Sequence, residues 1–436
     1  MHVTRSCFLG RSLFLTLSLV AGFAVTAVTP AIAADGWPQF RGPSQVGYVD
    51  EANPPLTWSE QENVTWKTPI SGLGWSTPII QDQQIWLTTA TPDGKEMFVY
   101  CLDADNGEVL FRERLFYNEE PEPLGNAVNG YASPSGAIEP GRFYAHFGSY
   151  GTAAINTETF EVLWKHTELE CRHFRGPGSS VVLVDDKLIL TMDGIDVQYL
   201  AALDTATGEI AWRTDRSTEW DDYDGDGNVI ADGDFRKGYG TPIVYEVEGQ
   251  TQLLSVGSMA AFAYDPQTGE EIWTVTFDGY NAASSPVIAN GLVMINTSTP
   301  RSILMAIDPA GTGDITATNV VWEYSRGVPT KPTPVVVDDE LIIFVNDGGI
   351  ATCLDAVTGE EIWKERLEGS YSASPVAAGG KVYFLGERGE APVLAASREF
   401  ERLAENSLPD GFMASPAIVG DTLYLRTRSH LYRIDD

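Results

Sequence analysis

The stretch that decides the fold is CLDAVTGEEIW, residues 353–363, because near copies of it recur along the chain. ALDTATGEIAW stands at 202–212 and AYDPQTGEEIW at 263–273, and looser copies occupy 101–111 and 154–164. In the closest copies, an Asp and a Thr-Gly pair separate two apolar runs, and the second run ends on Trp. The phrase therefore predicts a tight turn between the third and fourth strands of a repeated unit.

A second phrase, the Ser/Thr step, precedes the copies of the first. It consists of Ser or Thr, then in most instances Pro, then β-branched residues. Its eight instances begin at residues 76, 132, 179, 240, 284, 332, 373 and 414. From Pro242 onward, the prolines at 286, 334, 375 and 416 follow at intervals of 44, 48, 41 and 41 residues. A recurring period of this length is typical of a solenoid or a propeller and not of independent domains.

Each unit divides into four short strands, as residues 332–366 illustrate. The segments TPVVV, LIIFV, IATCLDA and EEIWKERL alternate with turns rich in Asp, Asn and Gly. Those residues tolerate positive φ or form hydrogen bonds with their own backbone, so they mark the turns of an antiparallel meander. Four strands repeated eight times predict an all-β fold, an eight-bladed β-propeller of four-stranded antiparallel blades.

The last unit supplies only three strands, within residues 414–435. We expect the segment ENVTWKTPI (62–70) to add the missing fourth strand, so that Trp66 takes the role that Trp363 has in its own blade. Joining two distant segments in one blade pairs strand edges that would otherwise be exposed. The propeller is thus predicted to be closed by its N-terminal strand.

The N-terminus has the features of a secretory signal peptide. Arg5 and Arg11 precede an apolar run at 13–25, and small residues follow at 31–36. We therefore expect an exported protein, located in the periplasm or secreted. The predicted domain boundaries are 1–34 for the signal peptide, 35–61 for a lead segment and 62–436 for the propeller, which carries an acidic insert at 219–236.

The net charge of −33, from 61 acidic and 28 basic residues, argues against nucleic acid and anionic membrane surfaces as partners. No stretch after the signal peptide is long and apolar enough to span a bilayer, so we expect a soluble monomer without a transmembrane anchor. Cys101 and Cys353 open equivalent copies of the repeat as CLDA, which places them in different blades and argues against a disulfide between them.

Aromatic and basic residues precede many of the Ser/Thr steps, in the connections from the outer strand of one blade to the inner strand of the next. These connections surround the central channel, where an aromatic rim with a few cations could bind a peptide strand or a glycan. The predicted ligand-binding rim comprises Trp75, Tyr131, Arg175, Tyr239, Tyr280, Lys331, Tyr371 and Phe412. The alternative is that these side chains only pack at the mouth of the channel.

The acidic insert contains DDYDGDGNVIADGDF at 221–235. From its second residue it reads D-x-D-x-D-G, which matches the first half of an EF-hand-like calcium loop. The second half departs from that pattern, because Gly233 stands where a bidentate Glu belongs. The predicted calcium ligands are Asp222, Asp224, Asp226, Asn228 and either Asp232 or Asp234. The alternative is a solvated acidic turn.

The repeated phrase resembles the tryptophan-docking signature A-x-D-x-x-T-G-E-x-x-W of the PQQ-like (pyrroloquinoline quinone repeat) β-propeller superfamily, most closely at 202–212 and 263–273. The lead WPQFRGP (37–43) resembles the start of exported bacterial members. The resemblance implies one of two functions. Some members are quinone-dependent dehydrogenases, whereas others, such as the propeller lipoprotein of the outer-membrane β-barrel assembly machinery, bind no quinone and are scaffolds for protein partners.

The residues favour the second group. The chain has no pair of adjacent cysteines, which the dehydrogenases typically carry under the quinone, and no Asp or Glu stands out as a base for alcohol oxidation. We therefore expect a non-catalytic module that binds a protein or polysaccharide partner, with calcium as the expected cofactor and without PQQ. The alternative is a PQQ-dependent dehydrogenase, in which Arg175, Arg326 and Lys331 are the cations available to face the quinone.

Overall fold

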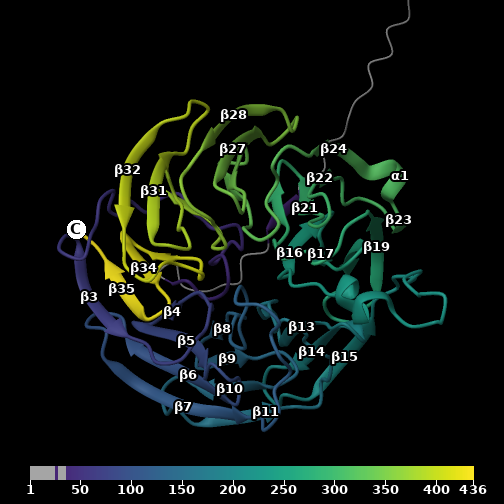
Figure 1. Cartoon of the computed structure of the whole chain (residues 1–436), viewed down its shortest axis with the longest axis horizontal. Helices are drawn as coiled ribbons and strands as arrows, with labels where there is room; N and C mark the ends of the chain where they lie inside the picture. Colours follow the sequence, from purple (N-terminus) through teal and green to yellow (C-terminus); the bar gives the residue numbers. More distant parts are fainter. Residues whose placement is uncertain (1–24, 28–35) are drawn as a thin grey trace, which may run out of the picture.

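The computed structural model describes residues 25–27 and 36–436. These residues form eight four-stranded antiparallel sheets arranged radially around one axis, which confirms the predicted eight-bladed β-propeller (Figure 1). The first strand of each blade lies next to the axis and the fourth lies at the outside. Most of the predicted signal peptide lies outside the described residues.

In the first four blades the strands follow chain order from the axis outward. Blade 1 comprises β4 (Ile79–Gln81), β5 (Gln84–Ala90), β6 (Glu96–Asp103) and β7 (Val109–Tyr117). Blade 2 comprises β8 (Ala137–Glu139), β9 (Arg142–His146), β10 (Thr152–Asn156) and β11 (Val162–His166). Blade 3 comprises β12 (Val182–Val184), β13 (Lys187–Asp193), β14 (Gln198–Asp204) and β15 (Ile210–Asp215). Blade 4 comprises β16 (Ile243–Val247), β17 (Gln250–Val256), β18 (Ala260–Tyr264) and β19 (Glu271–Thr276).

The second half of the ring repeats this order until blade 8. Blade 5 comprises β20 (Val287–Ala289), β21 (Leu292–Asn296), β22 (Leu304–Ile307) and β24 (Val320–Tyr324). Blade 6 comprises β25 (Val335–Val337), β26 (Leu341–Val345), β27 (Ile350–Asp355) and β28 (Glu361–Arg366). Blade 7 comprises β29 (Val376–Ala378), β30 (Lys381–Tyr383), β31 (Glu390–Ala395) and β32 (Arg402–Ser407). Blade 8 comprises β33 (Ala417–Val419), β34 (Thr422–Arg426), β35 (His430–Ile434) and β3 (Val64–Pro69).

A few short elements extend this frame. The axial edges of blades 4 and 7 gain β1 (Val25–Ala27) and β2 (Tyr48–Val49), respectively. The outer edge of blade 4 gains β23 (Gly313–Asp314). The connections contain a 3-10 segment, η1 (Ile230–Arg236), and one helical turn, α1 (Thr316–Asn319). Among the described residues, no helix has the length and apolar character needed to cross a membrane.

The repeated phrase builds the contact between neighbouring blades. The Asp204 carboxylate accepts a hydrogen bond from the N–H of Thr207 at 2.8 Å, which fixes the turn. Gly208 in that turn has a φ of +73°, and a Cβ there would lie 2.6 Å from the ring of Trp164 in the preceding blade. The turn therefore needs glycine both for its conformation and for the close approach of the ring. The Trp164 indole N–H completes the contact by donating to the Thr205 carbonyl at 3.0 Å.

The same stacking recurs around the ring. The other pairs are Trp66 over Gly107, Trp212 over Gly269 and Trp322 over Gly359. Two of the repeated tryptophans differ. Trp363 keeps the indole hydrogen bond, to the Ser397 carbonyl at 3.0 Å, but its ring packs against Phe400 and not against a glycine. Trp273 is fully buried, and its indole N–H donates at 3.1 Å to the side chain of Gln252 in its own blade. The reason is that residues 308–319 of the next blade form a longer connection with β23 and α1 instead of a Thr-Gly turn.

The N-terminal strand closes the ring as predicted. β3 pairs antiparallel with β35, from Val64 opposite Ile434 to Pro69 opposite His430. The indole N–H of Trp66 donates to a backbone carbonyl of blade 1 at 3.0 Å. The closing strand is therefore docked by the same tryptophan contact that joins blades 2 and 3, 3 and 4, and 5 and 6.

The lead segment, residues 36–50, is anchored to the axial edges of blades on opposite sides of the ring and therefore crosses one end of the central channel. Trp37 and Ile80 of blade 1 exchange two backbone hydrogen bonds of 2.7 and 2.9 Å. The Pro38 carbonyl accepts from the N–H of Ile138 in blade 2 at 2.9 Å. On the other side of the ring, β2 pairs in parallel with β29 of blade 7.

Arg41 anchors this segment. Its side chain is buried, and the guanidinium donates to the carbonyl of Pro334 at 2.8 Å and to that of Pro375, at the axial ends of blades 6 and 7. Burial lowers the pKa of Arg41 to about 9. The neighbouring Phe40 faces the channel. The WPQFRGP stretch therefore acts as a floor, a role that the sequence pattern alone did not reveal.

Candidate functional site

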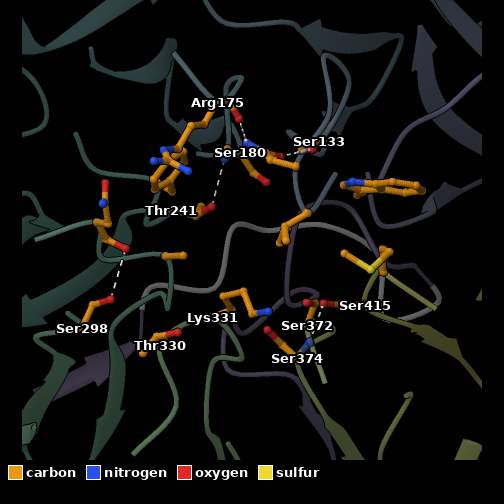
Figure 2. Close-up of a pocket in the computed structure, with 18 of the residues that line it drawn as sticks. Ser133, Arg175, Ser180, Thr241, Ser298, Thr330, Lys331, Ser372, Ser374 and Ser415 are labelled. Atoms are coloured by element: carbon orange, nitrogen blue, oxygen red, sulfur yellow. Dashed lines mark hydrogen bonds between the residues drawn. The ribbon is translucent and has the colours of Figure 1, made fainter. Parts of the chain in front are cut away.

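Above the lead segment the central channel widens into a cavity of about 600 Å³ (Figure 2). All eight blade-to-blade connections contribute to its wall, with one residue from each being Trp75, Asn126, Arg175, Tyr239, Asn281, Lys331, Ser372 and Met413. The ring of Phe40 contributes from the lead segment. A cavity of this volume lies in the size range of small-molecule sites.

Hydroxyl groups dominate the polar part of the wall. The ten that line it are Ser133, Ser135, Ser180, Thr241, Ser298, Thr299, Thr330, Ser372, Ser374 and Ser415. A hydroxyl both donates and accepts hydrogen bonds. The wall can therefore match a ligand that also carries many oxygen atoms.

The Ser/Thr steps of the repeat supply the innermost of these hydroxyls. At six positions the backbone N–H of one step donates to the hydroxyl of the equivalent step in the next blade, over 2.9–3.0 Å. The six links are Thr77 to Ser135, Ser135 to Ser180, Ser180 to Thr241, Ser285 to Thr333, Thr333 to Ser374, and Ser374 to Ser415. The recurring Ser or Thr is therefore needed to join neighbouring inner strands.

One instance of the step lies two residues later than expected. The expected step of blade 2 was ASPSG, with Ser133 and Pro134 as its core. In the structure Ser135 takes the equivalent place, since its hydroxyl accepts from Thr77 and its N–H donates to Ser180. The Ser133 hydroxyl instead donates to Asn129 within its own loop.

Two cations of the predicted rim reach the cavity, and both are paired with carboxylates. Arg175 forms a two-pronged ion pair with Asp234 of the acidic insert, with both N···O distances at 2.9 Å. The Lys331 ammonium lies 3.4 Å from Asp347 and 3.5 Å from Glu387. The charges of the wall are therefore largely compensated before any ligand binds.

The aromatic part of the predicted rim divides into two groups. Trp75 and Tyr239 line the cavity. Tyr371 and Phe412 are fully buried, and Tyr131 is buried with its hydroxyl donating to the carbonyl of Glu122, so for these three the expected rim position is corrected. The backbones of Tyr371 and Phe412 form bridges to Gly386 and Thr427, which lie between the second and third strands of the following blade, and both rings belong to the core.

Tyr280 also lies away from the cavity wall. Its ring packs against Phe235 of η1, with the ring centroids 4.7 Å apart. It therefore supports the acidic insert and does not line the cavity. The predicted rim thus contributes four residues to the cavity wall, namely Trp75, Arg175, Tyr239 and Lys331.

The acidic insert does not gather its predicted calcium ligands into one shell. Asp222 pairs with Arg236 and Asp234 with Arg175. Asp224 accepts hydrogen bonds from the backbone N–H groups of Asp226 and Asn228 at 2.9 and 2.8 Å, which orders a turn.

Asp232 stands apart from both ion pairs of the insert, and its backbone has a φ of +53°. Among residues 25–27 and 36–436, no three His, Cys, Asp or Glu side chains form a group suited to a metal. Calcium binding therefore stays a prediction. It requires Asp222 to exchange Arg236 for the ion, and Asp234 to exchange Arg175 where Asp234 and not Asp232 is the closing ligand.

A buried polar cluster that the sequence pattern did not indicate lies behind the Tyr239 wall. The Lys237 ammonium lies 3.1 Å from Nδ1 of His173, whose Nε2 lies 3.2 Å from the Cys171 sulfur. Burial lowers the pKa of both His173 and Lys237 and raises the pKa of Cys171. Lys237 also lies 4.8 Å from the centre of the Tyr239 ring. The cluster supports the position of Tyr239.

The wall of the cavity does not fit the needs of a metal-assisted quinone. A quinone with several carboxylates needs free cations, whereas Arg175 and Lys331 already hold carboxylates. Arg326 is 67% exposed and pairs with Glu361 at 3.3 Å. The free thiols of Cys101, Cys171 and Cys353 are buried and do not line the cavity.

Comparisons with known proteins agree on the fold. A family model described as outer membrane protein assembly factor BamB matches residues 44–212 and 196–436. The crystal structure of BamB from Moraxella catarrhalis is 13% identical, with 86% of this chain and 99% of that chain covered and a TM-score of 0.59.

Two dehydrogenases have higher TM-scores at a similar identity. Quinohemoprotein alcohol dehydrogenase from Comamonas testosteroni is 12% identical, with 92% of this chain and 80% of that chain covered and a TM-score of 0.66. A europium-containing methanol dehydrogenase is 12% identical, with 93% and 98% covered and a TM-score of 0.65. No curated protein matches the chain. At these identities the solved structures agree in fold, and the choice between binding and redox chemistry rests on the cavity itself.

Proposed function

We propose a function from the premise that this chain belongs to the PQQ-like propeller family whose model is described as outer membrane protein assembly factor BamB. In this proposal the protein is a non-catalytic binding module, and its partner, a protein or a polysaccharide, places a polar segment in the central cavity. The second candidate, a quinone-dependent dehydrogenase, shares the fold, but it is disfavoured because Arg175 and Lys331 of this chain are already paired with carboxylates.

The observation that carries the proposal is the composition of the cavity wall. Ten Ser and Thr hydroxyls surround a volume of about 600 Å³, while the three aromatic side chains Phe40, Trp75 and Tyr239 offer apolar faces. Such a wall can hold a ligand by many weak, directional hydrogen bonds, which suits the binding of a partner segment. The two cations are held by carboxylates and are not free to neutralise a charged cofactor.

The proposed location is the periplasm or the cell exterior. The signal peptide predicted over 1–34 supports export, and the family description names an outer-membrane assembly factor. The partner would then be a component of the cell envelope or its surroundings.

Site-specific crosslinking in the native cell tests the proposal even while the partner is unidentified. Val128 lines the cavity mouth and is 45% exposed, whereas Val321 is 54% exposed on the outer strand β24. We expect the photo-crosslinker p-benzoylphenylalanine at position 128 to capture a partner and the same residue at position 321 to capture none. An absence of product at 128, or an equal product at 321, would contradict a partner site in the cavity.

A further inference from the structure

We infer that the cavity receives the end of a neutral, hydroxyl-rich chain, that is, the terminal units of an uncharged glycan. This inference rests on the proposed function, because it names the ligand class of the same cavity. Three features carry it: a closed floor, a ring of free hydroxyl donors and a wall whose charges are already compensated.

The floor decides how a chain can enter. Phe40 lines the bottom of the cavity, and the lead segment around it is held by backbone hydrogen bonds to blades 1 and 2 and by the guanidinium of Arg41 to blades 6 and 7. A polymer therefore cannot pass through the propeller along its axis. It can only place one end in the cavity, from the open face.

The hydroxyl ring decides which groups that end must carry. Five of the linked hydroxyls line the cavity, namely those of Ser135, Ser180, Thr241, Ser374 and Ser415. Each accepts a backbone N–H from the preceding blade, and within the described part of the chain none of the five donates a hydrogen bond. Each therefore has its O–H proton available for a ligand oxygen. A ligand with several acceptor oxygens around one end satisfies these donors together.

The charges favour a neutral ligand over an acidic one. The chain has a net charge of −33, which repels anions at long range. Inside the cavity, Arg175 and Lys331 are held by Asp234, Asp347 and Glu387. An acidic end would have to displace one of these carboxylates, whereas a sugar hydroxyl does not.

The aromatic side chains complete the match. Trp75 and Tyr239 lie on different connections of the cavity wall. Aromatic rings combine apolar faces with a polar N–H or O–H group. The faces of a sugar ring present C–H groups that pack on such apolar surfaces, while its hydroxyls meet the donor ring. An extended neutral peptide offers one backbone carbonyl acceptor per residue, whereas a sugar ring carries several oxygen atoms, so a sugar at the end of a chain meets more of these donors at once.

Calorimetric titration of the full exported chain tests this inference. The probes are the linear gluco-, manno-, galacto- and xylo-hexaoses. Hexagalacturonate is the acidic control for the neutral galacto series. Cyclomaltohexaose is the control for linear maltohexaose, because it has the same sugar units but no chain ends. We expect binding by at least one neutral linear series, with at least tenfold weaker binding of the acidic probe and, for the α-gluco series, of the cyclic probe. Binding of none of the neutral probes overturns the inference, as does preference for the acidic or the cyclic match.

A cavity-filling variant tests the location. Ala283 lines the cavity with only a methyl group, so Ala283→Trp fills the space without removing a hydrogen-bonding side chain. Val321→Trp on the outer strand is the matched control. We expect Ala283→Trp to weaken binding at least tenfold at an unchanged melting temperature, with Val128→Trp as the second variant if the first melts early. Unchanged affinity in a folded filled variant overturns the inference. A partner crosslinked from position 128, without binding of any neutral probe, refutes the glycan and leaves the binding module intact.

Discussion

Removing the indole of Trp66 should weaken the closure of the ring by a predictable amount. The side chain is 9% exposed, its N–H donates to the Ala104 carbonyl at 3.0 Å, and its ring lies over Gly107. Truncating a buried Trp to Ala costs about 3–5 kcal/mol. The Ala104 carbonyl keeps a second donor, Arg433 at 2.9 Å, so no buried acceptor is left unpaired. We therefore expect Trp66→Ala to lower the free energy of unfolding by about 3–4 kcal/mol.

Two further variants separate the ring contact from the hydrogen bond. Trp66→Phe keeps a ring but loses the N–H, and its expected cost is about 1 kcal/mol. Gly107→Ala adds a Cβ that would lie 2.6 Å from the indole, at a φ of +72°. In the Trp66→Ala background the clash with the ring disappears, so Gly107→Ala should cost less there than in the native chain.

Denaturant unfolding of the full exported chain, followed by tryptophan fluorescence and circular dichroism, measures these differences. Deletion of residues 62–70 should expose the free edge of β35 and cause aggregation. A Trp66→Ala protein within about 1 kcal/mol of the native chain, well below the usual cost of such a truncation, would refute the docking account. So would equal costs of Gly107→Ala in the two backgrounds, or a deletion variant that remains monomeric with an unchanged melting temperature.

Three further predictions address the rim, the insert and the response to acid. Trp75→Ala should weaken partner binding with little change in melting temperature, whereas Tyr371→Ala should lower the stability by about 3–5 kcal/mol because its ring is buried; the reverse pattern would contradict the assignment. Calcium at about 10 mM, which exceeds the dissociation constants of weak extracellular sites, should raise the melting temperature. The double variant Asp224→Ala with Asp226→Ala should abolish that rise. Titration calorimetry that detects no heat of calcium binding would reduce the insert to an acidic turn. Burial lowers the pKa of His146 from 6.5 to about 3, so between these values the unfolded chain binds a proton that the folded chain does not. Stability should therefore fall with decreasing pH by about 1.4 kcal/mol per pH unit from this group, and His146→Gln should reduce that slope in pH-dependent unfolding; an unchanged slope would contradict a neutral buried imidazole.

The fold could be predicted from the sequence because its turns carry their own chemistry. The Asp, Thr and Gly of the repeated phrase specify a turn by local hydrogen bonds, and the following Trp marks the outer strand. The closure by β3 was predictable as well, since the last unit lacks a strand and residues 62–70 contain an equivalent Trp. Trp273 varies from the repeat because its partner turn is replaced in the next blade, a difference that only the contact reveals.

The site was less predictable because it depends on the directions of side chains. Trp75 and Tyr239, which precede a Ser/Thr step, line the cavity, but Tyr371 and Phe412 at the equivalent positions turn into the core. The floor formed by Arg41 depends on carbonyls at 334 and 375, nearly 300 residues or more away along the chain. The hydroxyls that link neighbouring blades did have a sequence signal, because Ser or Thr occurs at every step. The sequence pattern by itself indicates only that a strand starts there, and not that the hydroxyl lines a cavity.

The central claim is that the cavity is a binding site for a partner and not a quinone redox centre. The most direct test is the absorption spectrum of the purified exported chain after incubation with PQQ and calcium and removal of the free quinone, together with an assay of dye-linked alcohol oxidation. We predict no retained quinone chromophore and no dye reduction, because the cations of the cavity wall are held by carboxylates. A retained chromophore with alcohol-dependent dye reduction would contradict the claim and make the protein a dehydrogenase.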